Sequence, residues 1–416
     1  MGENSKRKKL VLWGTRILCL VALLLFAGCG KDEIPIEDYV PSNPGTRTMN
    51  PIMKSDTGYY YCAINRRPLN LHYFDMESGQ NIFLCSKPEC RHDGDVFCTA
   101  TSGKYTVRGA CYYGGSLYIN AVEETDNEYL CKLLKVSEDG TELEEVVTYQ
   151  AVNSTSLWVS SSEPMLIHRG VAVLPYYMRS NTEESVSVEG ICLYDLNTEE
   201  LVLLPETGED SQRAAYGSIT AYGDYIYYAV KQGRRYGLNR YSLTNKTEET
   251  LELANAFTGD YVVVDDNLLF YDYGGKNLYE YHAQDKKNVT HSYFYDKMDI
   301  TSPFLMTDGT YLYVGEGVTF QSFSTGYLGV LVSHDGTETE VPSYVHVFDR
   351  ELNPVAKVEI ATENYMEEAV SFSLAILDGT VYLKTYEAVF SCTLQEFLAN
   401  EIPPFKRLYD HIDIEF

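Results

Sequence analysis

The chain has 416 residues, and its 33 Lys and Arg against 60 Asp and Glu give a formal charge of −27. A hydrophobic content of 44 % is enough for a core, so the chain is not mainly disordered. The negative charge repels phosphate backbones, which argues against nucleic acid as a partner.

The first 28 residues have the parts of an export signal. A basic stretch at residues 6–9 precedes an apolar run from Ile17 to Phe26. The run is too short for a bilayer core of about 30 Å, which needs about 20 residues, so we predict a signal segment and exclude it from the fold. An ordinary secretory signal and an uncleaved anchor are the alternatives.

The end of this segment, Leu25-Phe26-Ala27-Gly28-Cys29, resembles the lipobox of bacterial lipoproteins. The resemblance implies a diacylglycerol on Cys29, cleavage just before it, and attachment to the outer face of the cell membrane. Removing residues 1–28 leaves 388 residues with 28 basic against 59 acidic side chains, a charge of −31. Residues 29–55 are proline-rich and predict a lipidated tether, and residues 56–416 predict a single domain.

A short signal recurs along that domain: a turn of Asp, Gly or Asn, then a strand of alternating aromatic and aliphatic residues. Its seven copies begin at Asp56, Gly114, His168, Gly223, Asp265, Asp308 and Asp378. Each is followed by a second strand, at residues 71–75, 130–135, 191–195, 238–242, 277–281, 344–349 and 389–392. The turns supply the positive φ values that hairpins need.

This recurrence predicts an all-β fold, a β-propeller of seven blades with four antiparallel strands each. Seven units over residues 56–416 give about 52 residues a blade, a usual blade size. Six blades plus an irregular segment is the closest rival. The only helix that the sequence suggests runs from Thr393 to Asn400, one or two turns, which excludes parallel α/β folds.

From residue 56 to about 392 the pattern resembles exported bacterial β-propeller lipoproteins, including YWTD-like propeller domains. The motif that carries the resemblance is Asp-Gly-x-Φ-Tyr-Φ followed by Leu-Tyr-x-Φ-Asp, where Φ is apolar. Such propellers mostly bind proteins, sugars or peptides, so the resemblance implies a scaffold rather than a reaction.

One segment is dense in metal-ligating residues. Three cysteines and one histidine lie within fourteen positions: Cys85, Cys90, His92 and Cys98. The segment is similar to a C-x-K-P-x-C-x-H stretch near the start of lipoproteins from anaerobic Gram-positive bacteria. Three interpretations stay open: a disulfide between two of the thiols, with the third reaching Cys62 or Cys111; a structural zinc site; or free thiols.

The remaining cysteines are dispersed. Cys131, Cys192 and Cys392 fall in second strands of different blades, where we expect buried, reduced thiols. Asp93-Gly94-Asp95 and Asp265-Asp266-Asn267 offer oxygen ligands for calcium, but an ordinary turn is the favoured interpretation.

Reaction motifs are missing: the chain has no H-E-x-x-H, no P-loop, no G-x-S-x-G and no dinucleotide fingerprint. Eight histidines are scattered singly. Tyrosine pairs at 112–113 and 176–177 and the stretch 293–295 suit a sugar platform, although packing between blades is the favoured interpretation.

We therefore expect a lipid-anchored, extracytoplasmic binding or protein-interaction module without catalysis or an obligatory cofactor, whose ligand is a protein or carbohydrate. The alternative is a carbohydrate-active enzyme, a polysaccharide lyase or glycoside hydrolase, with a Tyr or His base in the axial pocket. A third hypothesis is an accessory protein of a transporter.

Overall fold

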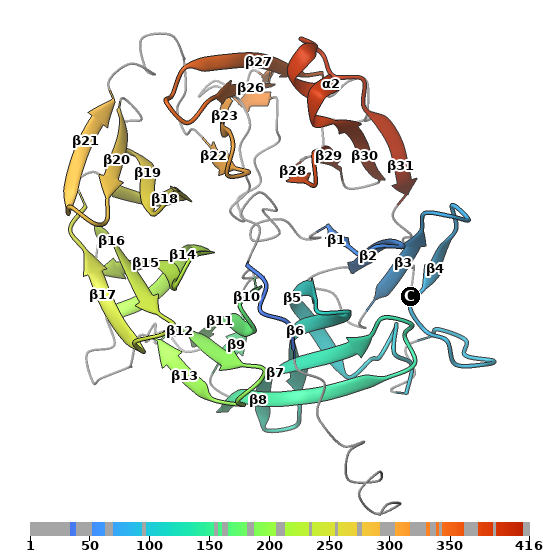
Figure 1. The fold of residues 1–416 in the computed structure, drawn as a ribbon. Coiled ribbons are helices and arrows are strands. Elements are labelled where there is room, and N and C mark those ends of the chain that lie inside the picture. The colour runs from blue at the N-terminus through green and yellow to red at the C-terminus, as the bar shows by residue number, and fades with distance from the viewer. Residues whose placement is uncertain are drawn as a thin grey trace, which may run out of the picture. The chain divides into compact units, whose positions relative to one another are not determined.

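Seven antiparallel sheets, each with four main strands and one with an additional fifth, follow one another along the chain and form a β-propeller, as seen in a computed structural model (Figure 1). The chain divides into two units, Met1–Ile36 and Glu37–Phe416, and every strand belongs to the second. The structure describes residues 34–38, 52–62, 70–93, 97–153, 157–159, 165–180, 187–204, 213–232, 235–253, 257–272, 277–291, 304–316, 330–332, 338–340, 343–361, 373–385 and 388–410.

Each blade is built from strands that are consecutive in the chain. Blades 1 to 3 contain β1 (Met53–Lys54), β2 (Gly58–Cys62), β3 (Leu71–Asp75) and β4 (Asn81–Phe83); β5 (Tyr105–Tyr113), β6 (Ser116–Glu124), β7 (Glu128–Ser137) and β8 (Leu143–Asn153); and β10 (Leu166–His168), β11 (Val171–Ser180), β12 (Ser187–Asp195) and β13 (Leu201–Leu204), with β9 (Leu157–Val159) beside β11.

Blades 4 to 7 repeat this order. They contain β14 (Arg213–Tyr222), β15 (Tyr225–Gln232), β16 (Arg235–Ser242) and β17 (Thr247–Leu251); β18 (Phe257–Val264), β19 (Asn267–Asp272), β20 (Leu278–His282) and β21 (Lys287–His291); β22 (Phe304–Thr307), β23 (Leu312–Glu316), β26 (Ser343–Phe348) and β27 (Pro354–Ile360); and β28 (Ser373–Leu377), β29 (Thr380–Lys384), β30 (Ala388–Thr393) and β31 (Lys406–Asp410). In blade 6 the hairpin of β24 (Val330–Val332) and β25 (Glu338–Glu340) is inserted between the second and third strands.

The predicted fold is confirmed, and the seven repeated signals are the turns and second strands of the seven blades. In four turns both central residues have positive φ, the geometry of a two-residue hairpin that matches the twist of its strands. Those turns lie at residues 114–115, 169–170, 265–266 and 378–379. The second predicted strand of each copy is the third strand of its blade.

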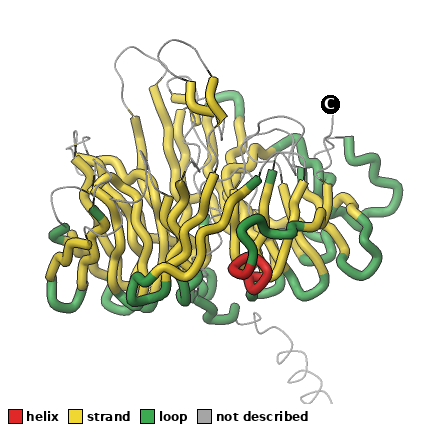
Figure 2. Tube along the Cα trace, turned by 90° about the horizontal axis from the view of Figure 1, so that it is seen from above, coloured by secondary structure: helices red, strands yellow, loops and turns green. Residues whose placement is uncertain are grey.

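Figure 2 shows strands throughout the second unit and one short helix. That helix, α2 (Leu394–Ala399), lies inside the predicted stretch from Thr393 to Asn400. It begins with a capping box, in which Thr393 accepts from the amide of Glu396 and the Glu396 side chain accepts from the amide of Thr393. Among the described residues, no helix is long and apolar enough to cross a membrane.

The core lies between neighbouring blades. Most of the largest fully buried side chains belong to second strands: Tyr60, Tyr227, Tyr228, Phe270, Tyr313 and Tyr382. Apolar clusters join blade 1 to blade 2, blade 3 to 4, and each later blade to the next. Packing between blades is therefore the main role of the repeated aromatic positions.

Blades 1 and 7 meet through side chains. Their shared cluster includes Tyr59, Tyr61, Tyr382 and Tyr409, all buried. The hydroxyls of Tyr59 and Tyr382 are 3.0 Å apart, and the rings of Tyr61 and Tyr409 stack at 5.2 Å. The first blade starts at β1, a little before the predicted domain start at residue 56, because Ile52 and Met53 are already buried in it.

We expect Tyr409→Ala to destabilise the propeller by about 3–5 kcal/mol, the usual cost of truncating a buried aromatic side chain. Chemical unfolding of the full chain in detergent measures this difference. Lys406→Ala, on an exposed position of the same strand, is the matched control and should change stability by less than about 0.5 kcal/mol. Equal effects of the two substitutions would show that the tyrosine seam does not hold the blades together.

Candidate metal centre and ligand cavity

The predicted cysteine segment is the connection between blades 1 and 2, from the end of β4 to the start of β5. It packs into the apolar core that these blades share, where Leu84, Cys98 and Ala100 are buried. The amide of Leu71, on β3, donates to the carbonyl of Ala100 at 2.9 Å. One backbone hydrogen bond therefore joins the connection to the third strand of blade 1.

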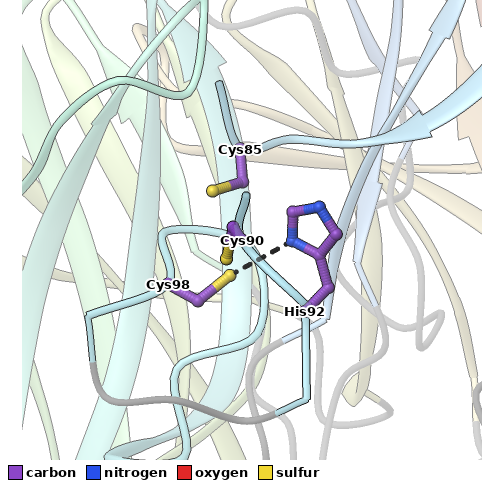
Figure 3. Close-up of side chains that lie close together, drawn as sticks. All are labelled: Cys85, Cys90, His92 and Cys98. Atoms are coloured by element: carbon purple, nitrogen blue, oxygen red, sulfur yellow. Dashed lines mark hydrogen bonds between the residues drawn. The ribbon is translucent and has the colours of Figure 1, made fainter. Parts of the chain in front are cut away.

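The structure brings all four predicted ligands together. One ligand atom from each lies within 4.8 Å of the others, and they form what we call the Cys₃His cluster: Cys85, Cys90, His92 and Cys98 (Figure 3). His92 Nδ1 lies 3.5 Å from the sulfur of Cys98. It is the only such group of three or more His, Cys, Asp or Glu ligands in the described part of the chain.

Local backbone geometry turns these donors inward. Glu89 and His92 both have positive φ, 61° and 54°, so the backbone is left-handed at one residue on either side of Cys90. The ring of His92 stacks on Phe83 at 4.6 Å between centroids, which fixes the plane of the imidazole. Cys98 is only 2 % exposed.

The surroundings shift the pKa values of two cluster thiols in opposite directions. Around Cys85, burial disfavours the thiolate, but hydrogen bonds from Thr99 and from the amide of Lys87 outweigh it and lower the pKa to about 7. At Cys98 burial prevails and raises the pKa, although the amide of Thr101 donates to its sulfur at 3.3 Å. The pKa values of these two thiols are therefore shifted in opposite directions.

Neighbouring turns anchor the connection. The hydroxyl of Thr99 lies 2.8 Å from the carbonyl oxygen of Gly140 and 3.1 Å from that of Leu84. Gly140 has φ of +68°, and its α-carbon faces the Leu84–Cys85 backbone so closely that a Cβ would lie 2.7 Å from it. At the other end, Lys104 Nζ is 2.7 Å from a carboxylate oxygen of Glu145 on β8. The loop is therefore held by blade 2 on both sides of Cys98.

All three cluster thiols are free cysteines in the structure, a state suited to metal ligation. Cys131, Cys192 and Cys392 are also free and buried, as expected for thiols that act as small apolar side chains.

The two Asp-rich turns, for which an ordinary turn is the favoured interpretation, are described to different extents. Asp265 and Asp266 form a positive-φ hairpin turn, and Asp265 is paired with Arg350 Nη1 at 2.8 Å. Of the other turn, Asp93 is described and residues 94–96 lie outside the described part of the chain. Asp265-Asp266-Asn267 is therefore an ordinary turn, the favoured interpretation.

A second feature, which sequence reasoning missed, is a cavity of about 930 Å³ lined by blades 1, 2, 3 and 7 and by Glu37 and Asp38. Its volume is typical of small-ligand sites. The charged lining consists of five carboxylates and one cation: Glu37, Asp38, Asp56, Glu138, Asp378 and Lys54. Lys54 is paired with Asp378 at 2.8 Å and Arg169 with Asp38 at 2.6 Å. Glu37, Asp56 and Glu138 are left in excess, so the lining is acidic.

Tyrosines form much of the remaining cavity wall. Tyr112 stacks on Tyr60 at 5.3 Å and its hydroxyl donates to Glu138 at 3.1 Å. Burial and the charge of Glu138 raise the pKa of Tyr112 to about 12, and burial also raises the pKa values of Tyr113 and Tyr382. A general base needs a pKa near the working pH, so these tyrosines suit binding rather than proton abstraction.

Arg169 binds Glu37 and Asp38, the first residues of the second unit, at the edge of the cavity. Its backbone amide donates to the carbonyl of Glu37 at 2.7 Å, and its Nε lies 2.6 Å from the carboxylate of Asp38. The hydrogen bond from Arg169 keeps the pKa of Asp38 below its usual value. Glu37 and Asp38, two residues of the predicted tether, are thus bonded to the turn between β10 and β11.

The other predicted residues have separate places. Cys29, residues 293–295, His334 and His411 lie outside the described residues. Tyr176 is buried, which agrees with packing, whereas Tyr112 and the buried Tyr113 both line the cavity. The described histidines outside the cluster are spread over blades 1, 3, 5 and 6: His72, His168, His282, His291 and His346.

Comparison with known proteins supports the fold alone. No protein-family model and no curated protein matches the chain. Among similar solved structures, a post-proline cleaving enzyme from Rickettsia typhi has 9 % identity and a TM-score of 0.50, covering 87 % of this chain and 53 % of its own.

An oligogalacturonate lyase in complex with manganese has 9 % identity and a TM-score of 0.42, covering 64 % of this chain and 73 % of its own. A nidogen/laminin complex has 10 % identity and a TM-score of 0.35, with coverages of 72 % and 92 %. At these identities a shared propeller fold does not transfer an activity.

We expect Gly140→Ala to loosen the cluster loop. Strain at positive φ costs about 1–2 kcal/mol, and the contact with the Leu84 backbone adds about 1–3 kcal/mol. Gly79→Ala is the matched control, because Gly79 has φ of +67° and open space around its α-carbon. Chemical unfolding of both variants measures the difference, and equal destabilisation would mean that the loop does not press on this turn.

Proposed function

We propose that this chain is a lipid-anchored, extracytoplasmic binding module, with its ligand site in the tyrosine-lined acidic cavity between blades 1, 2, 3 and 7. The observation that carries the proposal is the cavity itself: a wall of neutral tyrosines combined with five carboxylates and one paired lysine. The resemblance of residues 25–29 to a lipobox supports the lipid anchor on Cys29.

The cavity chemistry favours a ligand that carries amines, such as a basic peptide. Ammonium groups are attracted both by carboxylates and by the faces of aromatic rings. An acidic polysaccharide would bring further negative charge to the same wall and be repelled. This argues against a lyase or hydrolase that acts on acidic polysaccharides, which is one version of the alternative function.

The alternative function also requires a tyrosine base. The raised pKa values of Tyr112, Tyr113 and Tyr382 argue against these three in that role. Among the described residues, no histidine lines the cavity. A binding role requires neither group, because tyrosine rings and carboxylates bind a cation without changing their protonation.

Calorimetric titration of the full chain in detergent with oligolysine and with oligogalacturonate tests the ligand class. We expect oligolysine to bind, more weakly at higher ionic strength, and oligogalacturonate not to bind. Glu138→Gln should weaken oligolysine binding about two- to fivefold, the effect of losing one partly exposed charge pair.

The control is a similar pair at the opposite end of the same strands. Tyr129 and Glu124 are 3.5 Å apart, at the start of β7 and the end of β6, and neither lines the cavity. Glu124→Gln should therefore leave the affinity unchanged. Equal losses in the two variants, or tighter binding of oligogalacturonate, would refute the cavity as a site for amines.

Lipidation has a separate test. We expect Cys29→Ala to abolish incorporation of radiolabelled palmitate and to leave residues 1–28 attached in the intact mass, because the thioether forms on that sulfur. Cys19→Ala, in the apolar run of the signal, should leave both labelling and cleavage unchanged. Labelling that persists in Cys29→Ala would contradict the predicted anchor without affecting the cavity proposal.

A further inference from the structure

We propose that the Cys₃His cluster binds one Zn²⁺ ion as a closed structural site that holds the connection between blades 1 and 2. This inference is independent of the cavity and of its ligand. It starts from four donors of suitable chemistry that converge on one point: Cys85, Cys90, His92 and Cys98.

The donor set selects the class of metal. Three sulfurs and one imidazole nitrogen are soft to borderline ligands, which zinc accepts in tetrahedral structural sites. Calcium and magnesium require oxygen ligands, and the cluster contains none from a carboxylate. Zinc also has no redox chemistry that would oxidise neighbouring thiolates.

The spacing of the donors fits this geometry. With Zn–S of about 2.3 Å and Zn–N of about 2.05 Å, a tetrahedron has S···N edges of about 3.6 Å and S···S edges of about 3.8 Å. The observed distance from His92 Nδ1 to Cys98 Sγ is 3.5 Å, and no pair of donors exceeds 4.8 Å. Closure onto one ion therefore requires side-chain movements of about 1 Å or less.

The surroundings of the donors hold them in orientation. The amide of Thr101 donates to the sulfur of Cys98 at 3.3 Å. An N–H group of this kind orients the ligand beside it. Stacking on Phe83 orients the His92 ring in the same way, with Nδ1 toward the sulfurs (Figure 3).

All four positions of a tetrahedral ion would be filled by this chain, so no position is left for substrate or water. A site of this kind stabilises a fold rather than catalysing a reaction. Here the zinc ion would join Cys85, the second residue after β4, to Cys98, which is buried in the core between blades 1 and 2. Ligation would also protect the three thiols from oxidation outside the cytoplasm.

The test uses the full chain purified in detergent and measures bound metal by elemental analysis. We expect one zinc per chain, and after replacement by Co²⁺ the strong absorption of a tetrahedral thiolate complex. Cys90→Ser should weaken Zn²⁺ binding by more than about 100-fold. Changing a residue that only orients a ligand already costs up to about 100-fold, and Cys90 would be a ligand itself. Cys392→Ser removes a buried thiol in blade 7 and should leave the metal content unchanged.

A second measurement applies even if Cys90→Ser does not fold. The native wild-type chain is treated with iodoacetamide alone, with a chelator or with a reductant, and the masses of its peptides are measured. We expect Cys85, Cys90 and Cys98 to be modified only after chelation. Modification that requires a reductant shows a disulfide, and modification that requires neither shows free thiols. Either result, or the absence of bound metal from the wild type, overturns the proposal.

Discussion

The propeller depends on how its first and last blades meet. Within the described residues, blades 1 and 7 are each completed by their own consecutive strands, so no backbone ladder joins the two ends of the chain. Side chains must hold this seam, through the cluster around Tyr59, Tyr382 and Tyr409. Tyrosine suits the position because its ring buries a large apolar area and its hydroxyl finds a partner, as in the Tyr59–Tyr382 pair. The tyrosines of this cluster therefore serve the closure of the ring.

Sequence periodicity predicted the second and third strands of every blade, because these strands are buried and carry alternating aromatic and aliphatic residues. The outer strands could not be predicted in this way. β17 and β21, with the sequences TEETL and KNVTH, are largely polar and exposed, and only hydrogen bonding to the preceding strand makes them part of a sheet. β1 has two residues and therefore no periodicity at all. Hydrophobic periodicity in a sequence reflects which residues are buried. Where a strand is mostly exposed, its pairing with neighbouring strands determines that it forms.

The candidate site shows the same division. Cysteine and histidine spacing identified the four members of the Cys₃His cluster, but not that their donors converge. Convergence depends on positive φ at Glu89 and His92, residues that carry no glycine-like signal for such a conformation. The cavity could not be predicted, since closure of the propeller brings Lys54, Tyr112 and Asp378 together from the two ends of the domain. No local motif encodes that meeting.

A single turn connects the two features. The turn after β7 presents Glu138 to the cavity, where it accepts from Tyr112, and two residues later presents the carbonyl of Gly140 to Thr99. Thr99 directly follows Cys98, and the backbone carbonyl of Glu138 accepts from Tyr60, whose ring supports Tyr112. The cavity wall and the cluster loop therefore share one short piece of backbone. Because interiors are close-packed, displacement of this turn by either side changes the contacts of the other. We therefore expect a shift of the cluster loop at Gly140 to move Glu138 in the cavity wall as well.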